Sequence, residues 1–167
     1  MKKQQTHLMY GLITGIACVL LSIIFYVTGL SFKPWAQWVG YIPFLVGMIL
    51  NAQAYSKANE GFVSFGEVFS SCFKGTAVVT LIVLAWSFIM IYIFPELKEK
   101  GMEIARQKME ENNMSEEQID QAIEMTKKFF VAFMFGGILF GYLFYGAIIS
   151  LIAAATAKRK PKQATSL

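Results

Sequence analysis

The sequence has little charge, and the charge it has is confined to short segments. Only 16% of its 167 residues are Asp, Glu, Lys or Arg, whereas about a quarter is usual in a soluble domain. Apolar residues make up 56% and aromatic residues 15%. Four stretches almost free of charge are separated by short segments that hold nearly all of it. This distribution excludes an ordinary soluble domain and is typical of a chain that crosses a membrane several times.

Histidine and cysteine are also scarce, which limits the chemistry available. The single histidine is His7, and the two cysteines, Cys18 and Cys72, have no metal-ligand spacing. Membrane enzymes usually gather Asp, Glu, His or Cys near the ends of their spans, and the sequence has no such cluster. No phosphate-binding glycine loop is predicted, because no strand is predicted to precede one. We therefore expect no catalytic residue, no cofactor and no metal, and a protein that is not an enzyme.

The four apolar stretches each have the length of a transmembrane helix. They cover residues 8–30, 35–55, 68–94 and 129–157. At about 1.5 Å of rise per residue, a helix over each stretch crosses the roughly 30 Å hydrocarbon core. Lipid offers no partner to backbone amides and carbonyls, so each stretch is predicted to be helical. The sequence predicts an all-α, polytopic protein of four transmembrane helices, with residues 1–167 as a single membrane domain.

Basic residues near the ends of the spans predict the orientation. Six of them flank the two ends of the chain: Lys2, Lys3, Lys158, Arg159, Lys160 and Lys162. Such residues stay in the cytoplasm, and four spans place both termini on one side, so both termini are predicted to be cytoplasmic. Six basic residues in the connection 95–128 argue against this orientation, since it would place them outside. The lipid bilayer, with its anionic headgroups, is the expected partner of the basic ends, rather than nucleic acid.

Glycines recur along three of the predicted spans. Gly11 and Gly15 are in the first span, Gly47 is in the second, and Gly137 and Gly141 are in the fourth. Helices in lipid gain little from the hydrophobic effect, so small residues that permit close contact help to hold them together. These glycines predict helix packing inside one bundle or, alternatively, the seam of a homo-oligomer.

The connection 95–128 is the only long polar segment. Asn112-Asn113 predicts a helix end, and Ser115 with Gln118 three residues later predicts a capping box at the start of the next helix. The segment is therefore predicted to be a helical hairpin that extends the third and fourth spans beyond the membrane. It contains six basic and nine acidic residues. It is either a solvated connector or a docking surface for a partner.

Two charged residues stand where the chain re-enters the membrane at the third span. Glu67 and Lys74 are seven residues apart, so they share one face of a helix. Ionisable residues buried in a membrane bundle are candidates for transport. At the interface, a lysine instead extends its amine to the headgroups. The pair is either a helix-end anchor or part of a transport site.

A short motif surrounds this pair. Residues 61–69 read Gly-Phe-Val-Ser-Phe-Gly-Glu-Val-Phe, and Gly75 follows. With the tyrosine-glycine opening of the first span and the basic tail, this motif resembles a family of small bacterial membrane proteins catalogued as domain of unknown function 4199. The resemblance implies a four-helix fold in the bacterial inner membrane and supplies no catalytic or binding residues. The motif positions of first interest are Ser64, Phe65, Gly66, Glu67 and Phe69.

These features predict a non-enzymatic integral membrane protein that assembles with itself or with a membrane-protein partner. The alternative is a small oligomeric transporter or channel. The spans contain few polar groups that could line a path for it, mainly Thr14, Ser22, Asn51, Thr76, Thr80 and Ser87. A membrane enzyme acting on lipid ranks third, because the acids and histidines it needs are missing.

Overall fold

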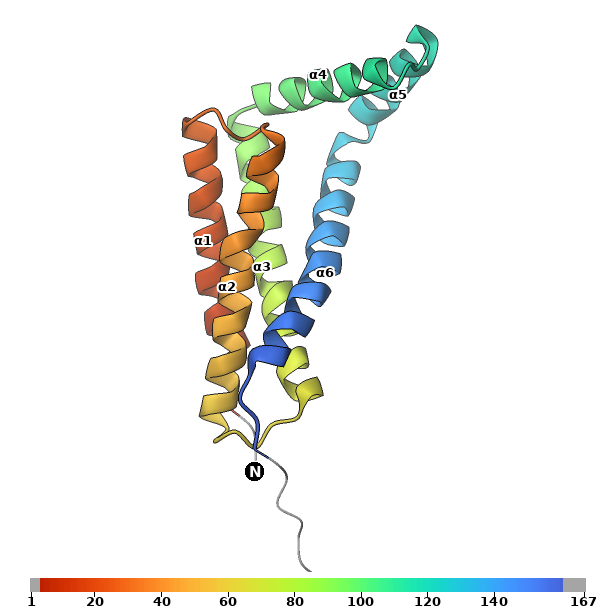
Figure 1. Ribbon diagram of the computed structural model, residues 1–167. Helices are drawn as coiled ribbons and strands as arrows, with labels where there is room; N and C mark the ends of the chain where they lie inside the picture. Colours follow the sequence, from red (N-terminus) through yellow and green to blue (C-terminus); the bar gives the residue numbers. More distant parts are fainter. Residues whose placement is uncertain (1–3, 161–167) are drawn as a thin grey trace, which may run out of the picture. The chain divides into compact units, whose positions relative to one another are not determined.

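The computed structural model describes residues 4–160, and these residues form helices joined by turns. The helices are α1 (His7–Val27), α2 (Pro34–Ala58), α3 (Phe65–Ile93), α4 (Glu96–Glu111), α5 (Glu116–Lys128) and α6 (Phe130–Thr156) (Figure 1). The described range contains no strand, so the all-α prediction is confirmed. Of the basic residues that predict the orientation, Lys2, Lys3 and Lys162 lie outside the described residues.

Three of these helices, α1, α3 and α6, are long and apolar enough to cross a membrane. They correspond to the predicted spans 8–30, 68–94 and 129–157, although α3 begins three residues earlier, at Phe65. Three such helices are the pattern of a multi-pass membrane protein. The helix at the predicted second span, α2, has 25 residues but is less apolar, and it is not among the three.

The described chain contains two compact units. The first unit comprises Met1–Val83 and Gly141–Leu167, and the second comprises Leu84–Phe140. In the first unit, α1 and α2 run antiparallel beside the first part of α3 and the last part of α6 (Figure 1). Phe44 and Met48 of α2, Val68 and Val79 of α3, and Ala153 of α6 are completely buried in its core. Cys18 of α1 belongs to the same buried cluster, so all four chain segments of this unit share one interior.

The two glycines of α1 allow close approach to α3. A Cβ at Gly11 would lie 2.8 Å from the Cβ of Val78, and a Cβ at Gly15 would lie 3.1 Å from the Cβ of Ile82. Any side chain at either position would have to displace a β-branched residue of the facing helix. The structure thus places both glycines in helix packing within the chain.

Two further glycines of the first unit lie under threonine side chains. A Cβ at Gly47 of α2 would overlap Thr14 of α1, and a Cβ at Gly146 of α6 would overlap Thr76 of α3. Thr14 and Thr76 are both buried. These contacts join α1 to α2 and α3 to α6.

The glycines at the start of α6 behave differently. Gly141 is half-buried, and a Cβ there would make only an ordinary contact, 3.9 Å from Tyr41 Oη. Gly137 is exposed, and a Cβ there would meet nothing within 4 Å in the part of the chain that the structure describes. Gly137 lies in the second unit, and its predicted role in helix packing or in the seam of a homo-oligomer stays a prediction.

A buried amide joins three segments of the first unit. Asn51 of α2 is completely buried; its Oδ1 accepts a 2.6 Å hydrogen bond from Thr6 Oγ1, and its Nδ2 donates to Ser71 Oγ at 3.4 Å. Farther along the core, Thr76 and Ser150 form a hydrogen bond of 3.4 Å between α3 and α6. Within residues 4–160, no buried side-chain nitrogen or oxygen lacks a hydrogen-bond partner. The polar groups of this interior therefore bond to one another or to backbone.

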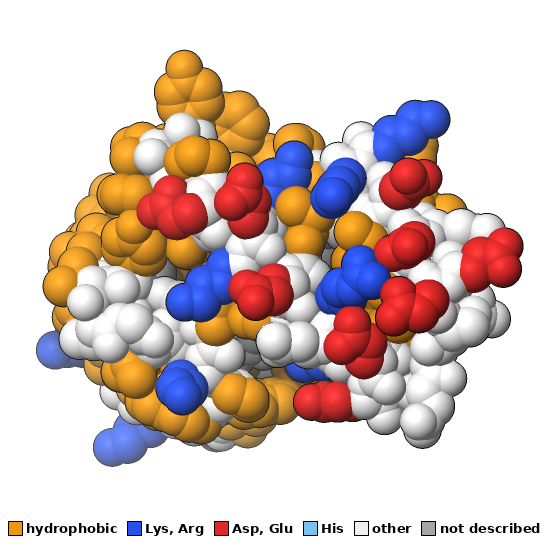
Figure 2. Space-filling view, turned by 90° about the horizontal axis from the view of Figure 1, so that it is seen from above, with side chains coloured by type: hydrophobic (Ala, Val, Ile, Leu, Met, Phe, Trp, Pro, Cys, Tyr) orange, Lys and Arg blue, Asp and Glu red, His pale blue; other side chains and the backbone are white. Residues whose placement is uncertain are grey.

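The second unit contains α4 and α5. Ser115 and Gln118 form the predicted capping box at the start of α5, so this prediction is confirmed. Arg106 of α4 forms ion pairs with Glu116 at 3.2 Å and Asp120 at 3.0 Å. Figure 2 shows basic and acidic side chains intermixed on the face that carries these helices.

Candidate functional site

The motif 61–69 forms the tight connection between α2 and α3 and the first turn of α3. Glu60 and Gly61 both have left-handed backbone conformations, with φ of 55° and 81°. Glycine adopts this region without the steric cost of a side chain. The glycine that opens the motif is therefore explained by the reversal of the chain.

Ser64 and Glu67 form a reciprocal cap at the start of α3. The Ser64 backbone N–H donates to Glu67 Oε2 at 2.7 Å, and the Glu67 backbone N–H donates to Ser64 Oγ at 3.2 Å. These two bonds satisfy backbone donors that have no partner inside the helix. The prediction from sequence paired Glu67 with Lys74 and missed this cap, although Ser-x-x-Glu is the signal for it. Two residues of the motif thus have a structural role.

Two hydrogen bonds fix the backbone of the basic tail after α6, one to the last turn of α2 and one to the α2–α3 connection. Ser56 Oγ donates to the carbonyl oxygen of Lys158. The backbone N–H of Lys160 donates to the carbonyl oxygen of Gly61 at 2.8 Å. Gly61 leaves room for this contact, because a Cβ there would lie 3.2 Å from Lys160 Cγ.

Phe62 and Phe65 of the motif contact basic side chains of the tail. The guanidinium of Arg159 lies 5.5 Å from the centroid of the Phe65 ring. The ammonium of Lys160 lies 5.1 Å from the centroid of the Phe62 ring. A cation at this distance from a ring is attracted by its electron-rich face. Two phenylalanines of the motif therefore each contact one cation of the tail.

The residues before α1 also contact the α2–α3 connection. The Gln4 backbone N–H donates to Asn59 Oδ1 at 2.9 Å, and Asn59 Nδ2 donates to the Gln4 carbonyl oxygen at 3.2 Å. Residues 4–7, 56–67 and 157–160 thus meet at one end of the first unit, which we call the motif end.

A hollow of about 480 Å³ opens at the motif end. Its lining residues are Gln5, His7, Tyr55, Ser64, Gly66, Glu67, Ser70, Ser71 and Lys74. It therefore brings together Glu67 and Lys74, the pair predicted from sequence, and adds His7. A carboxylate, an imidazole and an ammonium can bind a polar headgroup or exchange protons. Across residues 4–160, no group of three or more His, Cys, Asp or Glu side chains could hold a metal ion.

The remaining motif positions lie outside the lining of this hollow. Phe69 packs against the buried core and stacks on Phe73, with ring centroids 5.8 Å apart. Phe65 is directed to Arg159. The five motif positions therefore divide between helix capping, core packing, contact with the tail and the wall of the hollow.

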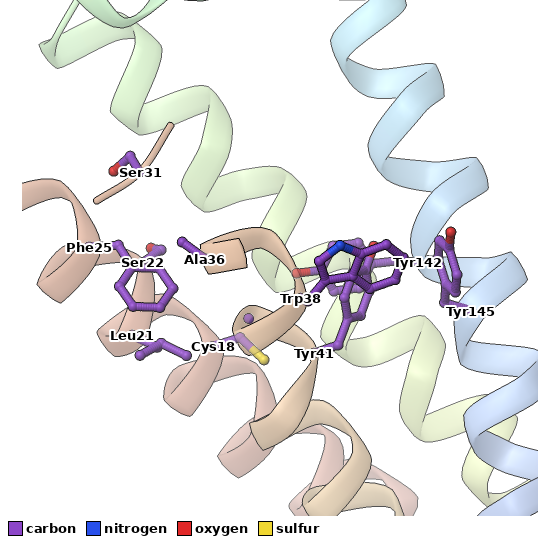
Figure 3. A pocket seen from close by; sticks show the side chains of 11 residues that line it. Cys18, Leu21, Ser22, Phe25, Ser31, Ala36, Trp38, Tyr41, Tyr142 and Tyr145 are labelled. Carbon is purple, nitrogen blue, oxygen red and sulfur yellow. The ribbon is translucent and has the colours of Figure 1, made fainter. Parts of the chain in front are cut away.

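A second pocket, of about 390 Å³, lies among α1, α2 and α6 (Figure 3). Trp38 and Tyr41 of α2 reach toward Tyr142 and Tyr145 of α6. The ring centroids of Tyr41 and Tyr145 are 5.1 Å apart, and those of Trp38 and Tyr145 are 6.2 Å apart. Its lining includes no Asp, Glu, His, Lys or Arg among the described residues. The pocket offers ring faces and hydroxyl groups, which suit an apolar or ring-bearing lipid better than acid–base chemistry.

Comparison with known proteins identifies the family and nothing more specific. No curated protein and no solved structure matches the chain. The family described as "Protein of unknown function (DUF4199)" matches residues 9–159, which include the motif and the first two basic residues of the tail. The match covers most of the chain, from α1 to the end of α6, so the resemblance carried by the motif is confirmed. The chain belongs to the DUF4199 family.

Proposed function

We propose that this chain is a non-enzymatic assembly or interaction component of the bacterial inner membrane, which it crosses with four helices. The observation that carries the proposal is the packed interior of the first unit. Its polar side chains bond to one another or to backbone, so they are engaged within the bundle and are not free to line a polar path.

The fourth crossing is α2, which lies beside α1 over its whole length. Phe25 and Trp35 are in edge-to-face contact at one end, with ring centroids 6.2 Å apart, and Gly47 lies under Thr14 near the middle. Asn51 reaches Thr6 at the other end. With 25 residues, α2 is roughly 37 Å long, enough for the membrane. Because α2 lies beside the apolar helix α1 along its length, we infer that α2 crosses the membrane together with α1.

The polar residues of α2 explain its lower hydropathy. Asn51 is completely buried in the bundle, and Lys57 lies in its last turn. The middle of its exposed face is apolar and includes Ile42, Val46 and Leu50. A mean hydropathy taken over all sides of a helix includes the inward-facing amide of Asn51, although this amide does not contact lipid. The lipid-facing side of α2 is as apolar as a membrane helix needs.

The sidedness follows from the motif end. Residue 4 contacts Asn59, and Lys158 and Lys160 contact Ser56 and Gly61, so both ends of the described chain lie at the same end of the unit. This agrees with an even number of crossings. Basic residues favour the cytoplasm, and we place the motif end there. A C-terminal reporter enzyme that is active only outside the cytoplasm is expected to be silent; an active reporter contradicts this orientation.

The interior favours assembly over transport. Thr14, Asn51, Thr76 and Thr80 are among the few polar residues available for a path, and all four are buried. Asn51 bonds to Thr6 and Ser71, and Thr80 donates to the Thr76 carbonyl oxygen at 2.9 Å. Groups committed to such bonds do not solvate a passing substrate. The exposed charges of α4 and α5, placed outside the membrane, then supply the surface for a partner.

The test is the composition of the protein after gentle extraction of a tagged copy from its native membrane. We expect a stoichiometric partner that is lost when residues 98–127 are replaced by a short loop. The control is Gly40→Ala, since a Cβ at Gly40 meets nothing within 4 Å among the described residues. Recovery as a homo-oligomer without another protein contradicts the proposal and favours a transporter or channel.

A further inference from the structure

A pocket of about 640 Å³ lies between the basic tail and the end of α2. Its lining residues are Gln53, Ser56, Lys57, Glu60, Gly61, Thr156, Lys158, Arg159 and Lys160. Four of these side chains are cationic and one is a carboxylate, so the pocket has an excess of positive charge. Its chemistry matches an anion.

The four cations are available to such a ligand. None of Lys57, Lys158, Arg159 and Lys160 forms an ion pair with any residue between 4 and 160. Arg159 and Lys160 rest on phenylalanine rings, which attract a cation without replacing a hydrogen-bond acceptor. Their N–H groups can still donate to phosphate oxygens.

Two hydrogen bonds hold the backbone of Lys158 and Lys160 in place before any ligand arrives. The tail is bonded to the last turn of α2 through the Ser56 hydroxyl and the Lys158 carbonyl, and to the α2–α3 connection through Gly61 and Lys160. Binding therefore does not have to order the tail, which lowers its entropic cost. The phenylalanine contacts restrain the side chains of Arg159 and Lys160.

The pocket continues into apolar helix surface. On α2, Leu50 and Val46 lie one and two turns before Gln53, and both are 49% exposed. On α6, Ile152 lies one turn before Thr156 and is 48% exposed. A ligand held in the pocket by an anionic group can thus lay apolar chains along α2 and α6. A soluble anion without acyl chains would contact only the charged part of the pocket.

We propose that this pocket binds the phosphate of an anionic phospholipid from the adjoining leaflet, with its acyl chains against α2 and α6. The site rests on the proposed membrane placement, in which the motif end lies at headgroup level. Lys57, Lys158 and Arg159 donate to the phosphate oxygens; α2 positions Lys57, and the contacts of the tail position Lys158 and Arg159. The motif thereby serves lipid recognition.

The test is lipid binding to the full chain in a neutral detergent, followed by native mass spectrometry. Added phosphatidylglycerol is expected to give more bound lipid than phosphatidylcholine. The double variant Lys57→Gln/Lys158→Gln is expected to lower phosphatidylglycerol affinity by roughly five-fold for each removed charge. The matched control is Lys108→Gln/Lys127→Gln, which removes the same charge from exposed residues of α4 and α5.

Three further measurements decide the outcome. The variant Lys57→Arg/Lys158→Arg keeps both charges, so it should bind like the parent chain, and thermal melting confirms that each variant is folded. Glycerol 3-phosphate, which has no acyl chains, should compete weakly; complete displacement of the lipid at equal concentration would make the site one for soluble phosphate and overturn the proposal. Equal losses in the site and control variants, or equal binding of both lipids, would also overturn it. The lipid-binding assay involves no protein partner. A negative result would therefore contradict the lipid site without contradicting the proposed role in assembly.

Discussion

Gly47 of α2 lies directly against Thr14 of α1, and a single methyl group at position 47 would overlap the threonine side chain. Thr14 is 3% exposed, so it has no free space to move into. We expect Gly47→Ala to lower the free energy of unfolding by about 1–3 kcal/mol, the usual cost of overpacking. Titration with a denaturing detergent, followed by circular dichroism, measures it.

The matched control for this change is Gly40→Ala in the same helix. A Cβ at Gly40 meets nothing within 4 Å among the described residues. Alanine is a better helix former than glycine, so this variant should be as stable as the parent chain or slightly more stable. Equal losses at both positions would show that the contact with Thr14 is not the cause.

Asn51 links the start of the chain to α2 and α3. We expect Asn51→Ala to destabilise the first unit by about 0.6–2 kcal/mol, the range measured for hydrogen bonds between membrane helices. Thr6→Val removes only the 2.6 Å bond to Asn51 Oδ1. A double-mutant cycle of the two changes should show coupling, whereas Gln53→Ala, on the exposed face of α2, should not couple to Thr6→Val. Full additivity of the first pair would mean that the bond contributes nothing.

Ser64 caps α3 through its hydroxyl. We expect Ser64→Ala to cost about 0.5–2 kcal/mol and to speed hydrogen exchange at the Glu67 amide, since this N–H donates to Ser64 Oγ. Glu67→Gln keeps an acceptor oxygen, so it should be milder. The control is Ser70→Ala, an exposed serine one turn farther along α3. If Ser64→Ala left the exchange rate at Glu67 unchanged, the cap would have no role in holding the start of the helix.

Arg106 joins α4 to α5. The neighbouring Asp120 carboxylate, followed by Glu110 and Glu116, raises the pKa of Arg106 above its usual value. A raised pKa stabilises the fold at every pH below the unfolded value, and this stabilisation is lost only as pH rises through the folded value. The link should therefore persist from pH 7 to pH 10 and weaken in high salt, which screens exposed ion pairs. Arg106→Gln should speed amide exchange in α5 at pH 7, and Lys108→Gln should not; equal rates in these two variants would contradict the link.

Much of the fold could be predicted from the sequence, because helix formation in lipid follows from local properties. Charge-free runs of sufficient length predicted the three apolar helices α1, α3 and α6, and Ser115 with Gln118 predicted the start of α5. The glycines of α1 could be predicted to pack, but their partners, Val78 and Ile82, could not, since small size permits close packing without specifying the neighbour. The contacts of Phe65 with Arg159 and of Gly61 with Lys160 join residues nearly a hundred positions apart, which periodicity does not encode.

The sequence by itself determined that this chain is helical, that at least three helices suit a membrane, and that it belongs to its family. These properties depend on composition and short motifs. Only the tertiary structure decided that the basic tail contacts the family motif, that Glu67 and Lys74 line one hollow with His7, and that the polar groups of the interior bond to one another or to backbone. Each of these depends on the distance between side chains from different helices or turns, which is set when the helices pack.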